Sequence, residues 1–128
     1  EVHRNGALDF SLLSKAAARL LELGVHEWVV IHAPEGALAR HKDGTIHLQG
    51  SVAMPAERIV GTAGAGDAFA AGALMGLHEG WSMPECLRMG VCTAATCLLG
   101  ATCTESILTA DACLKLAAEL GFRPAPAA

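Results

Sequence analysis

IVGTAGAGDAF, the sequence of residues 59–69, combines three glycines with a single acidic residue. Glycine lets the backbone turn tightly and approach a bound anion closely. The residues that follow favour a helix, so the turn leads directly into a helix N-terminus. Unpaired N–H groups at such a terminus, together with the positive end of the helix dipole, attract phosphate groups. The segment therefore predicts a phosphate-binding turn at the start of a helix.

Asp67 follows the last of these glycines, and two roles are open for it. Aspartate commonly caps a helix by accepting hydrogen bonds from the first backbone N–H groups. An aspartate beside a bound phosphate can instead act as a general base that takes a proton from an attacking hydroxyl. The turn taken alone does not separate these two roles.

Two other phosphate-binding motifs fit the chain less well. The GxxxxGK[ST] pattern of a Walker P-loop is absent from the sequence. A GxGxxG pattern starting at Gly64 fails because position 69 is Phe. A Rossmann-like site also needs a following strand that ends in an acidic residue, and helices are expected here. A Rossmann-like cofactor site is therefore the weaker alternative.

The hydrophobic pattern predicts an α/β protein. Apolar residues recur at helical spacing over residues 12–21, and Gly24 favours the end of that helix. Residues 28–32, Trp-Val-Val-Ile-His, form an apolar run typical of a buried inner strand. Residues 37–49 predict a hairpin at the sheet edge, turning at 42–44. Residues 58–60 are expected to form another short strand.

Three helices are expected after residue 66. The first begins at the glycine-rich turn and ends near Gly80. Ser82 and Glu85 form the pattern of a capping box, which predicts a second helix from about Pro84 to Leu98. Thr109 is a suitable cap for the last helix.

Composition points to one compact domain over residues 1–128. Hydrophobic residues make up 52% of the chain and charged residues 17%. The net charge of −4 and the lack of a basic run exclude nucleic acid and an acidic membrane surface as partners. The longest uncharged stretch, residues 89–104, has 16 residues and is too short to span a bilayer.

Five cysteines are present without a CxxC pair, and the six histidines are scattered without ligand spacing. Neither pattern indicates a metal site or a disulfide framework. We expect reduced thiols that pack in helices, and a cytoplasmic protein.

Residues 59–69 resemble the second signature of the PfkB, or ribokinase, family of carbohydrate kinases, DTxGAGD followed by x-F. The GAGD core and the Phe are intact. Residues 23–37 resemble the strand and glycine-rich turn before the family's hairpin, and residues 72–74 and 94–95 fall where its small-residue helices lie. The resemblance covers only the C-terminal half of the family. It implies a ribokinase-like three-layer α/β/α fold with a mostly parallel sheet and an edge hairpin.

The resemblance also implies a function, an ATP-dependent phosphotransferase acting on a hydroxyl of a sugar or nucleoside. Asp67 would be the general base, and the Gly64-Ala65-Gly66 loop would be the anion hole, using the N–H groups of residues 65–67. Magnesium would arrive with the nucleotide. The residues that would border the nucleotide are Thr62, Ala63, Glu35, Gly36, Val91, Ala94 and Ala95.

The chain departs from the family pattern on the nucleotide and cation side. Residues 31–33, Ile-His-Ala, stand where the family has Thr-x-Gly, and Val91 stands near a frequent Asn. We interpret His32 as a structural or rim histidine. The acid that opens the signature is replaced by Gly61. Potassium is therefore a doubtful cofactor, because Gly100, Ala101 and Thr104, which resemble the rest of its site, would offer only neutral oxygens.

Two functional hypotheses stay open. The intact residues 64–67 favour a kinase. The departures and the missing half favour a non-catalytic nucleotide-binding module, or a truncated fragment that has lost turnover. We expect the isolated 128-residue chain to be inactive and its partner to be the missing N-terminal half or a second copy. The residues that choose the substrate are expected upstream of Glu1.

Overall fold

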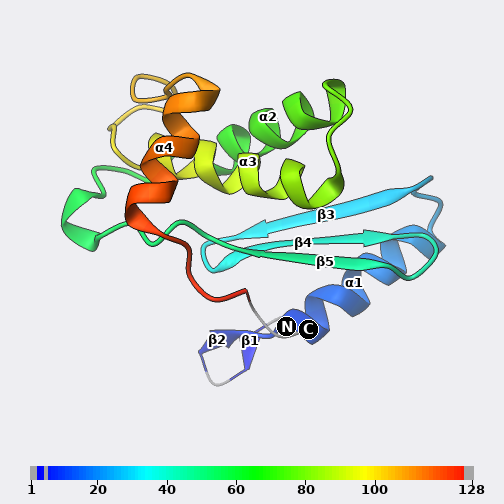
Figure 1. The fold of residues 1–128 in the computed structure, drawn as a ribbon. Helices are drawn as coiled ribbons and strands as arrows, with labels where there is room; N and C mark the ends of the chain where they lie inside the picture. Colours follow the sequence, from blue (N-terminus) through cyan, green and yellow to red (C-terminus); the bar gives the residue numbers. More distant parts are fainter. Residues whose placement is uncertain (1–2, 5, 126–128) are drawn as a thin grey trace.

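The computed structural model describes residues 3–4 and 6–125. A small two-stranded hairpin comes first, followed by one helix, a three-stranded sheet and three further helices (Figure 1). The elements are β1 His3–Arg4, β2 Ala7–Leu8, α1 Phe10–Glu22, β3 Trp28–Ala33, β4 Gly36–His41, β5 Ile46–Gly50, a 3-10 turn Ala56–Arg58, α2 Ala65–His78, α3 Met83–Cys97 and α4 Ala110–Leu120.

The strands of the main sheet lie in the order β3-β4-β5 and pair antiparallel throughout. The prediction of a mostly parallel sheet is therefore wrong for the described residues. The cause is connection length, because parallel neighbours need a crossover of a dozen or more residues. Here residues 34–35 join β3 to β4, and residues 42–45 join β4 to β5. The predicted hairpin over residues 37–49 is confirmed by β4 and β5.

β3 was expected to be an inner strand, but it lies at one edge of this three-stranded sheet. Its side chains alternate between the two faces, as a strand requires. Val29 is buried against α1, whereas Val30 on the other face is 37% exposed. The strand expected at residues 58–60 is absent from the described structure, and the 3-10 turn Ala56–Arg58 precedes an extended Ile59.

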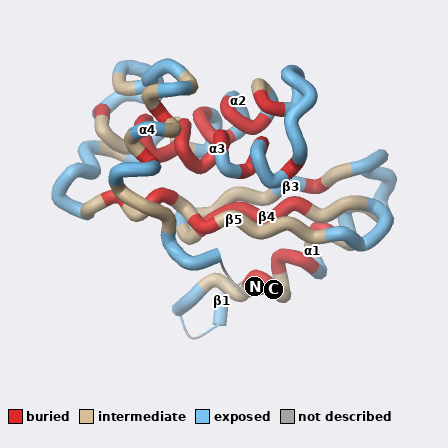
Figure 2. Tube along the Cα trace, viewed as in Figure 1, coloured by how far each residue is buried: buried red, intermediate tan, exposed pale blue. Residues whose placement is uncertain are grey.

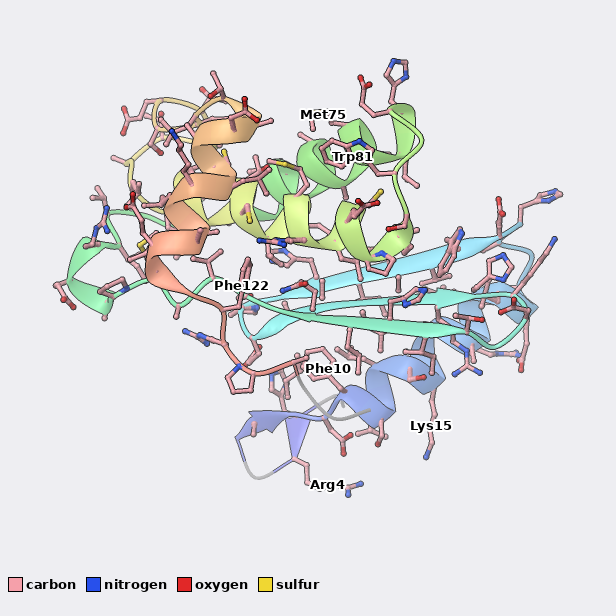
Figure 3. All side chains as sticks on the ribbon, in the orientation of Figure 1. Arg4, Phe10, Lys15, Met75, Trp81 and Phe122 are labelled. Atoms are coloured by element: carbon pink, nitrogen blue, oxygen red, sulfur yellow. The ribbon has the colours of Figure 1, made fainter. Side chains whose placement is uncertain are left out.

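Helix α1 covers one face of the sheet, and α2, α3 and α4 lie on the opposite face (Figure 1). Helix α1 begins where Asp9 accepts hydrogen bonds from the N–H groups of Ser11 and Leu12, at 2.9 and 3.2 Å. Its apolar side, which includes Phe10 and Leu13, packs on the sheet. Figure 3 shows Phe10 on this side of the sheet and Phe122 on the other.

Helix α3 is the most buried element of the molecule, as Figure 2 shows. It packs against α2, α4 and the sheet. Its predicted capping box is confirmed, because Glu85 Oε2 accepts hydrogen bonds from the Ser82 N–H and hydroxyl, at 2.8 and 2.7 Å. The three helices expected after residue 66 are also confirmed.

The segment after α4 returns to the sheet side of the helical layer. The N–H of Ala53 donates to the carbonyl of Gly121 at 2.8 Å, and the N–H of Arg123 donates to the carbonyl of Ser51 at 2.8 Å. These bonds hold residues 121–123 beside the segment that follows β5. Across the residues that the structure describes, no helix combines the length and apolar character needed to cross a bilayer.

Candidate active site

The turn before α2 requires glycine at position 64. Gly64 is the N-cap residue of α2 and has a left-handed backbone, with φ of 81°. A Cβ atom there would also lie 2.6 Å from the Cβ of Cys103. Both the conformation and the lack of space therefore exclude a side chain. The thiol of Cys97 fixes the same turn by donating to the carbonyl of Ala63 at 3.3 Å.

Two backbone N–H groups remain available at the start of α2. The N–H of Ala65 donates to the carbonyl of Thr62 at 3.3 Å, and that of Ala68 donates to the carbonyl of Gly64 at 2.8 Å. Within residues 3–4 and 6–125, no acceptor is found for the N–H groups of Gly66 and Asp67. The anion hole that the sequence predicts would thus use these two groups, while Ala65 stabilises the turn.

Asp67 lies in the first turn of α2 with an exposed side chain. The N-cap position belongs to Gly64, and no side chain in the described part of the chain caps this helix. The capping role that the sequence left open for Asp67 is therefore not the one that the structure shows. Among the described residues its carboxylate has no hydrogen-bond or ion-pair partner, so it is available to a ligand.

A cleft of about 340 Å³ opens beside this turn. Three sets of residues line it. The first is Thr62, Ala65 and Gly66 at the start of α2, and the second is Val91, Ala94 and Ala95 on α3. The third is the end of β3 with the segment after β5, which includes His32, Ala33, Pro34, Ser51, Val52 and Met54.

Six of the residues that the sequence singled out thus line one cleft. Ala63, Gly64 and Asp67 stand beside it in the same turn, and Glu35 and Gly36 do not line it. Gly36 is buried, and a Cβ atom there would collide with the carbonyl of Gln49, so this glycine serves the hairpin. The carbonyl of Glu35 accepts a hydrogen bond from the N–H of Ser51 at 3.1 Å.

The walls of the cleft are mainly apolar, and polar side chains are few. They are His32, Ser51, Thr62 and Arg123. No pattern in the sequence indicated Ser51 or Arg123, because backbone pairing of residues 121–123 with the segment after β5 brings the C-terminal segment to the cleft. His32 was interpreted as a structural or rim residue, and its position at the cleft is the main addition made by the structure.

The imidazole of His32 stacks on the ring of Phe69 from α2. The ring centroids are 4.3 Å apart and the planes are inclined by 3°. Partial burial lowers the pKa of His32 below its usual value, because desolvation disfavours the charged ring. Phe69 also fills the space left by Gly90 of α3. His32, α2 and α3 therefore pack as one unit at the cleft.

Beside Gly61, the residues Gly100, Ala101 and Thr104 were expected to offer a cation only neutral oxygens. A Cβ atom at Gly61 would lie 3.1 Å from the carbonyl oxygen of Gly100, so the two segments are in contact. Glu105, which the sequence did not single out, accepts hydrogen bonds from the N–H groups of Ala101 and Thr102. In the described part of the chain, no cluster of three or more acidic, His or Cys side chains could hold a metal.

All five cysteines are free thiols, four of them buried in helices and Cys103 exposed in a loop. Burial raises the pKa of Cys92 to about 11, so this thiol stays protonated at neutral pH. The expectation of packing thiols is met by the four helical cysteines.

The chain thus combines an α/β fold with a glycine-rich turn that leads into a helix beside a mainly apolar cleft. The chain belongs to the pfkB family of carbohydrate kinases, whose family model matches residues 5–110. It is 35% identical over 83 residues to 5-dehydro-2-deoxygluconokinase of Geobacillus thermodenitrificans, covering 65% of this chain and 24% of that one. It is 36% identical over 89 residues to ribokinase of Arabidopsis thaliana, covering 70% and 23%.

Solved structures of the same family have a similar fold. Arabidopsis thaliana ribokinase complexed with ribose and ATP matches with a TM-score of 0.74 and 30% identity, over 84% of this chain and 34% of that chain. Phosphofructokinase-2 of Escherichia coli in complex with potassium matches with a TM-score of 0.69 and 25% identity, over 94% and 36%. The chain thus spans about a quarter to a third of the length of these relatives.

Proposed function

We propose that this chain is the ATP-binding, catalytic-base part of a kinase that phosphorylates a hydroxyl group of a sugar or related small molecule. The observation that carries the proposal is the start of α2. There an exposed Asp67, which has no partner among the described residues, follows a glycine turn, and two N–H groups without an acceptor lie at the helix start beside a cleft. In the full-length protein we propose a three-layer α/β/α sandwich around the same sheet.

Each part of the turn has a chemical task in this proposal. Asp67 accepts the proton of the substrate hydroxyl, which makes the oxygen a better nucleophile for the γ-phosphate of ATP. The N–H groups of Gly66 and Asp67 donate to the oxygens of the transferring group and stabilise the charge that develops on them. Gly64 keeps the turn free of side chains, so that the phosphate can approach the backbone closely.

The cleft suits a nucleotide. Its volume of about 340 Å³ lies in the range of small-molecule sites, and its walls are largely apolar. A base and ribose would lie against Val91, Ala94 and Ala95 on α3, with the phosphates directed to the start of α2. Magnesium would be held mainly by the phosphates, since it commonly keeps several waters and few protein ligands. We propose weak dependence on potassium, because Gly61 supplies no carboxylate.

The second candidate is a nucleotide-binding module without turnover. The departures from the family pattern at residues 31–33, Gly61 and Val91 favour it, because these segments are the ones expected on the nucleotide or cation side. The free carboxylate of Asp67 favours the kinase, since a module that only binds ATP has no need of a base at this position.

Replacing the base tests the kinase proposal. In the full-length protein, Asp67→Asn should reduce kcat by two to four orders of magnitude, about the range of general-base catalysis, while ATP still binds. The assay is transfer of radiolabelled phosphate from ATP to a panel of sugars and nucleosides, with ATP affinity measured by calorimetry. Asp111→Asn is the matched control, because Asp111 is an exposed aspartate in the first turn of α4.

Unchanged turnover in Asp67→Asn would refute the assigned base. ATP binding by the unaltered protein without phosphate transfer to any acceptor would favour the binding module. Equal losses in the two variants would show that an aspartate in a helix first turn matters only for folding.

A further inference from the structure

The proposed nucleotide cleft has little positive charge. Of its lining side chains, only His32 and Arg123 can carry a positive charge, and lysine is absent from the lining. The phosphates of ATP carry several negative charges, and the chain itself has a net charge of −4. A group that becomes cationic when the phosphates arrive would offset this imbalance.

The position of His32 fits such a group. Val29 and Ile31 of β3 belong to the apolar cluster around α1, so the alternation of the strand turns His32 toward α2. The imidazole stacks on Phe69 at 4.3 Å. Phe69 lies four residues after the start of α2, which is about 6 Å along the helix axis. His32 also lines the same cleft as Ala65 and Gly66, so the residue and the start of α2 border one space.

The ring nitrogens of His32 are open to a ligand. Among the described residues no hydrogen bond involves the imidazole, and none of the buried side-chain nitrogens or oxygens lacks a partner. Every buried side-chain nitrogen or oxygen in the described structure has a partner, and the imidazole nitrogens of His32 have none. These nitrogens are therefore not fully buried. They are reached from the cleft that the side chain lines.

We propose that His32 contacts the phosphate groups of the bound nucleotide and takes up a proton when they bind. This inference rests on the proposed function, since it assigns a further phosphate-binding residue to the same cleft. It replaces the interpretation of His32 as a structural or rim residue.

The charged groups around His32 do not prevent it from taking up this proton. Burial alone accounts for the low pKa of His32 in the free protein. The elements around the cleft carry three further ionisable groups, Asp67 on α2, Glu35 in the turn after β3 and Arg123 in the cleft lining. None of them contributes to the shift. On α3, Arg88 lies over the ring of Phe122, at 5.4 Å from its centroid, and is engaged there.

The affinity for ATP is therefore expected to depend on pH. The ring is neutral in the free protein at pH 7, and bound phosphates raise its pKa by favouring the charged form. Protonation and binding are therefore coupled, so that ATP binds more tightly as the pH falls from the bound-state pKa to the free-state pKa. Below the free-state pKa the ring is protonated in both states, and this contribution to the pH dependence ends.

Calorimetry of the full-length protein tests the inference. ATP with magnesium is titrated at pH 7 in buffers of different ionisation enthalpy, without an acceptor substrate, and proton uptake is obtained from the slope. We expect uptake in the unaltered protein and less uptake in His32→Phe, which keeps an aromatic stack on Phe69. At pH 6.5 the variant should bind ATP roughly 10-fold more weakly, as expected for one lost charge-assisted hydrogen bond.

The matched control is His47→Phe. His47 also stacks on an aromatic ring, that of Trp28 at 5.8 Å, but it does not line the cleft. We expect this variant to keep the proton uptake and the ATP affinity of the unaltered protein. Equal uptake in His32→Phe and the unaltered protein would overturn the inference.

A second measurement covers the case in which His32→Phe fails to fold. The titration of the His32 ring in the unaltered protein is followed by NMR with labelled histidine, and the His32→Gln variant is used for assignment. A rise in the pKa of His32 on addition of ATP supports the inference, and an unchanged pKa contradicts it. Absence of ATP binding to the unaltered protein would instead refute the proposed nucleotide site itself.

Discussion

Gly72 lies in the middle of α2, where the helix passes close to α3. A Cβ atom at this position would lie 2.8 Å from the carbonyl oxygen of Met89 and would crowd the hydroxyl of Thr93. Thr93 cannot move away easily, because it is buried and donates to the same carbonyl at 2.9 Å. The two helices must therefore shift apart to admit even one methyl group.

We predict that Gly72→Ala destabilises the full-length protein by about 1–3 kcal/mol, the usual cost of overpacking. Urea unfolding measures the change. Gly66→Ala is the control within the same helix, because a Cβ atom at Gly66 would meet nothing within 4 Å. That variant should keep its stability. A Gly72→Ala protein as stable as the unaltered one would mean that α2 and α3 do not pack as closely as the structure shows.

At the scale of elements, the hairpin of β4 and β5 is stabilised at its turn by Asp43. Its carboxylate accepts a hydrogen bond from the N–H of Thr45 at 2.8 Å and lies 3.0 Å from Nδ1 of His41. Hydrogen bonding to Thr45, with a smaller effect of His41, lowers the pKa of Asp43 to about 2. The carboxylate is the stabilising form. Its contribution is present above the ordinary pKa of 3.8 and is lost as the pH falls through about 2.

We predict that an NMR titration finds the Asp43 carboxyl half protonated near pH 2 and that Thr45→Val moves this midpoint up toward 3.8. The valine keeps the shape of the side chain but removes its hydroxyl. Asp111 in α4 serves as an internal reference, since Thr45 lies in a different element. A midpoint for Asp43 that does not respond to Thr45→Val would show that the turn is held in another way.

The helices and the hairpin were predictable from the sequence, whereas the direction of the strands was not. α1, the hairpin, the capping box of α3 and the three later helices depend on local spacing and turn residues, and all were expected. Strand direction depends on which segments become neighbours. The apolar run of β3 indicated a buried strand but not its antiparallel partner. The same limit applies to the cleft, where the glycine turn was predictable and Arg123 was not, because tertiary pairing of the C-terminal segment with the residues after β5 brings it there.

For the molecule as a whole, one side combines an unpaired strand edge with exposed apolar residues. β3 has no strand beyond it among the described residues, and Val30 on this strand is 37% exposed. Leu74 and Leu77 of α2 are 62% and 46% exposed. Unpaired strand edges and apolar patches of this kind favour association with another chain or segment. The chain also spans only about a third of the structures it resembles.

We therefore predict that residues 1–128, purified alone, transfer no phosphate from ATP to a sugar. The turn with Asp67 is present, but a kinase also needs residues that hold the acceptor hydroxyl in line with the phosphate, because orientation supplies much of the rate. Radiolabel transfer to ribose and other sugars measures the activity, and size-exclusion chromatography measures association. Co-expression with the remainder of the full-length protein is the positive control and should restore transfer. Sugar-dependent transfer by the isolated chain would contradict the prediction, and would mean that the acceptor site is formed within these 128 residues or between two copies of them.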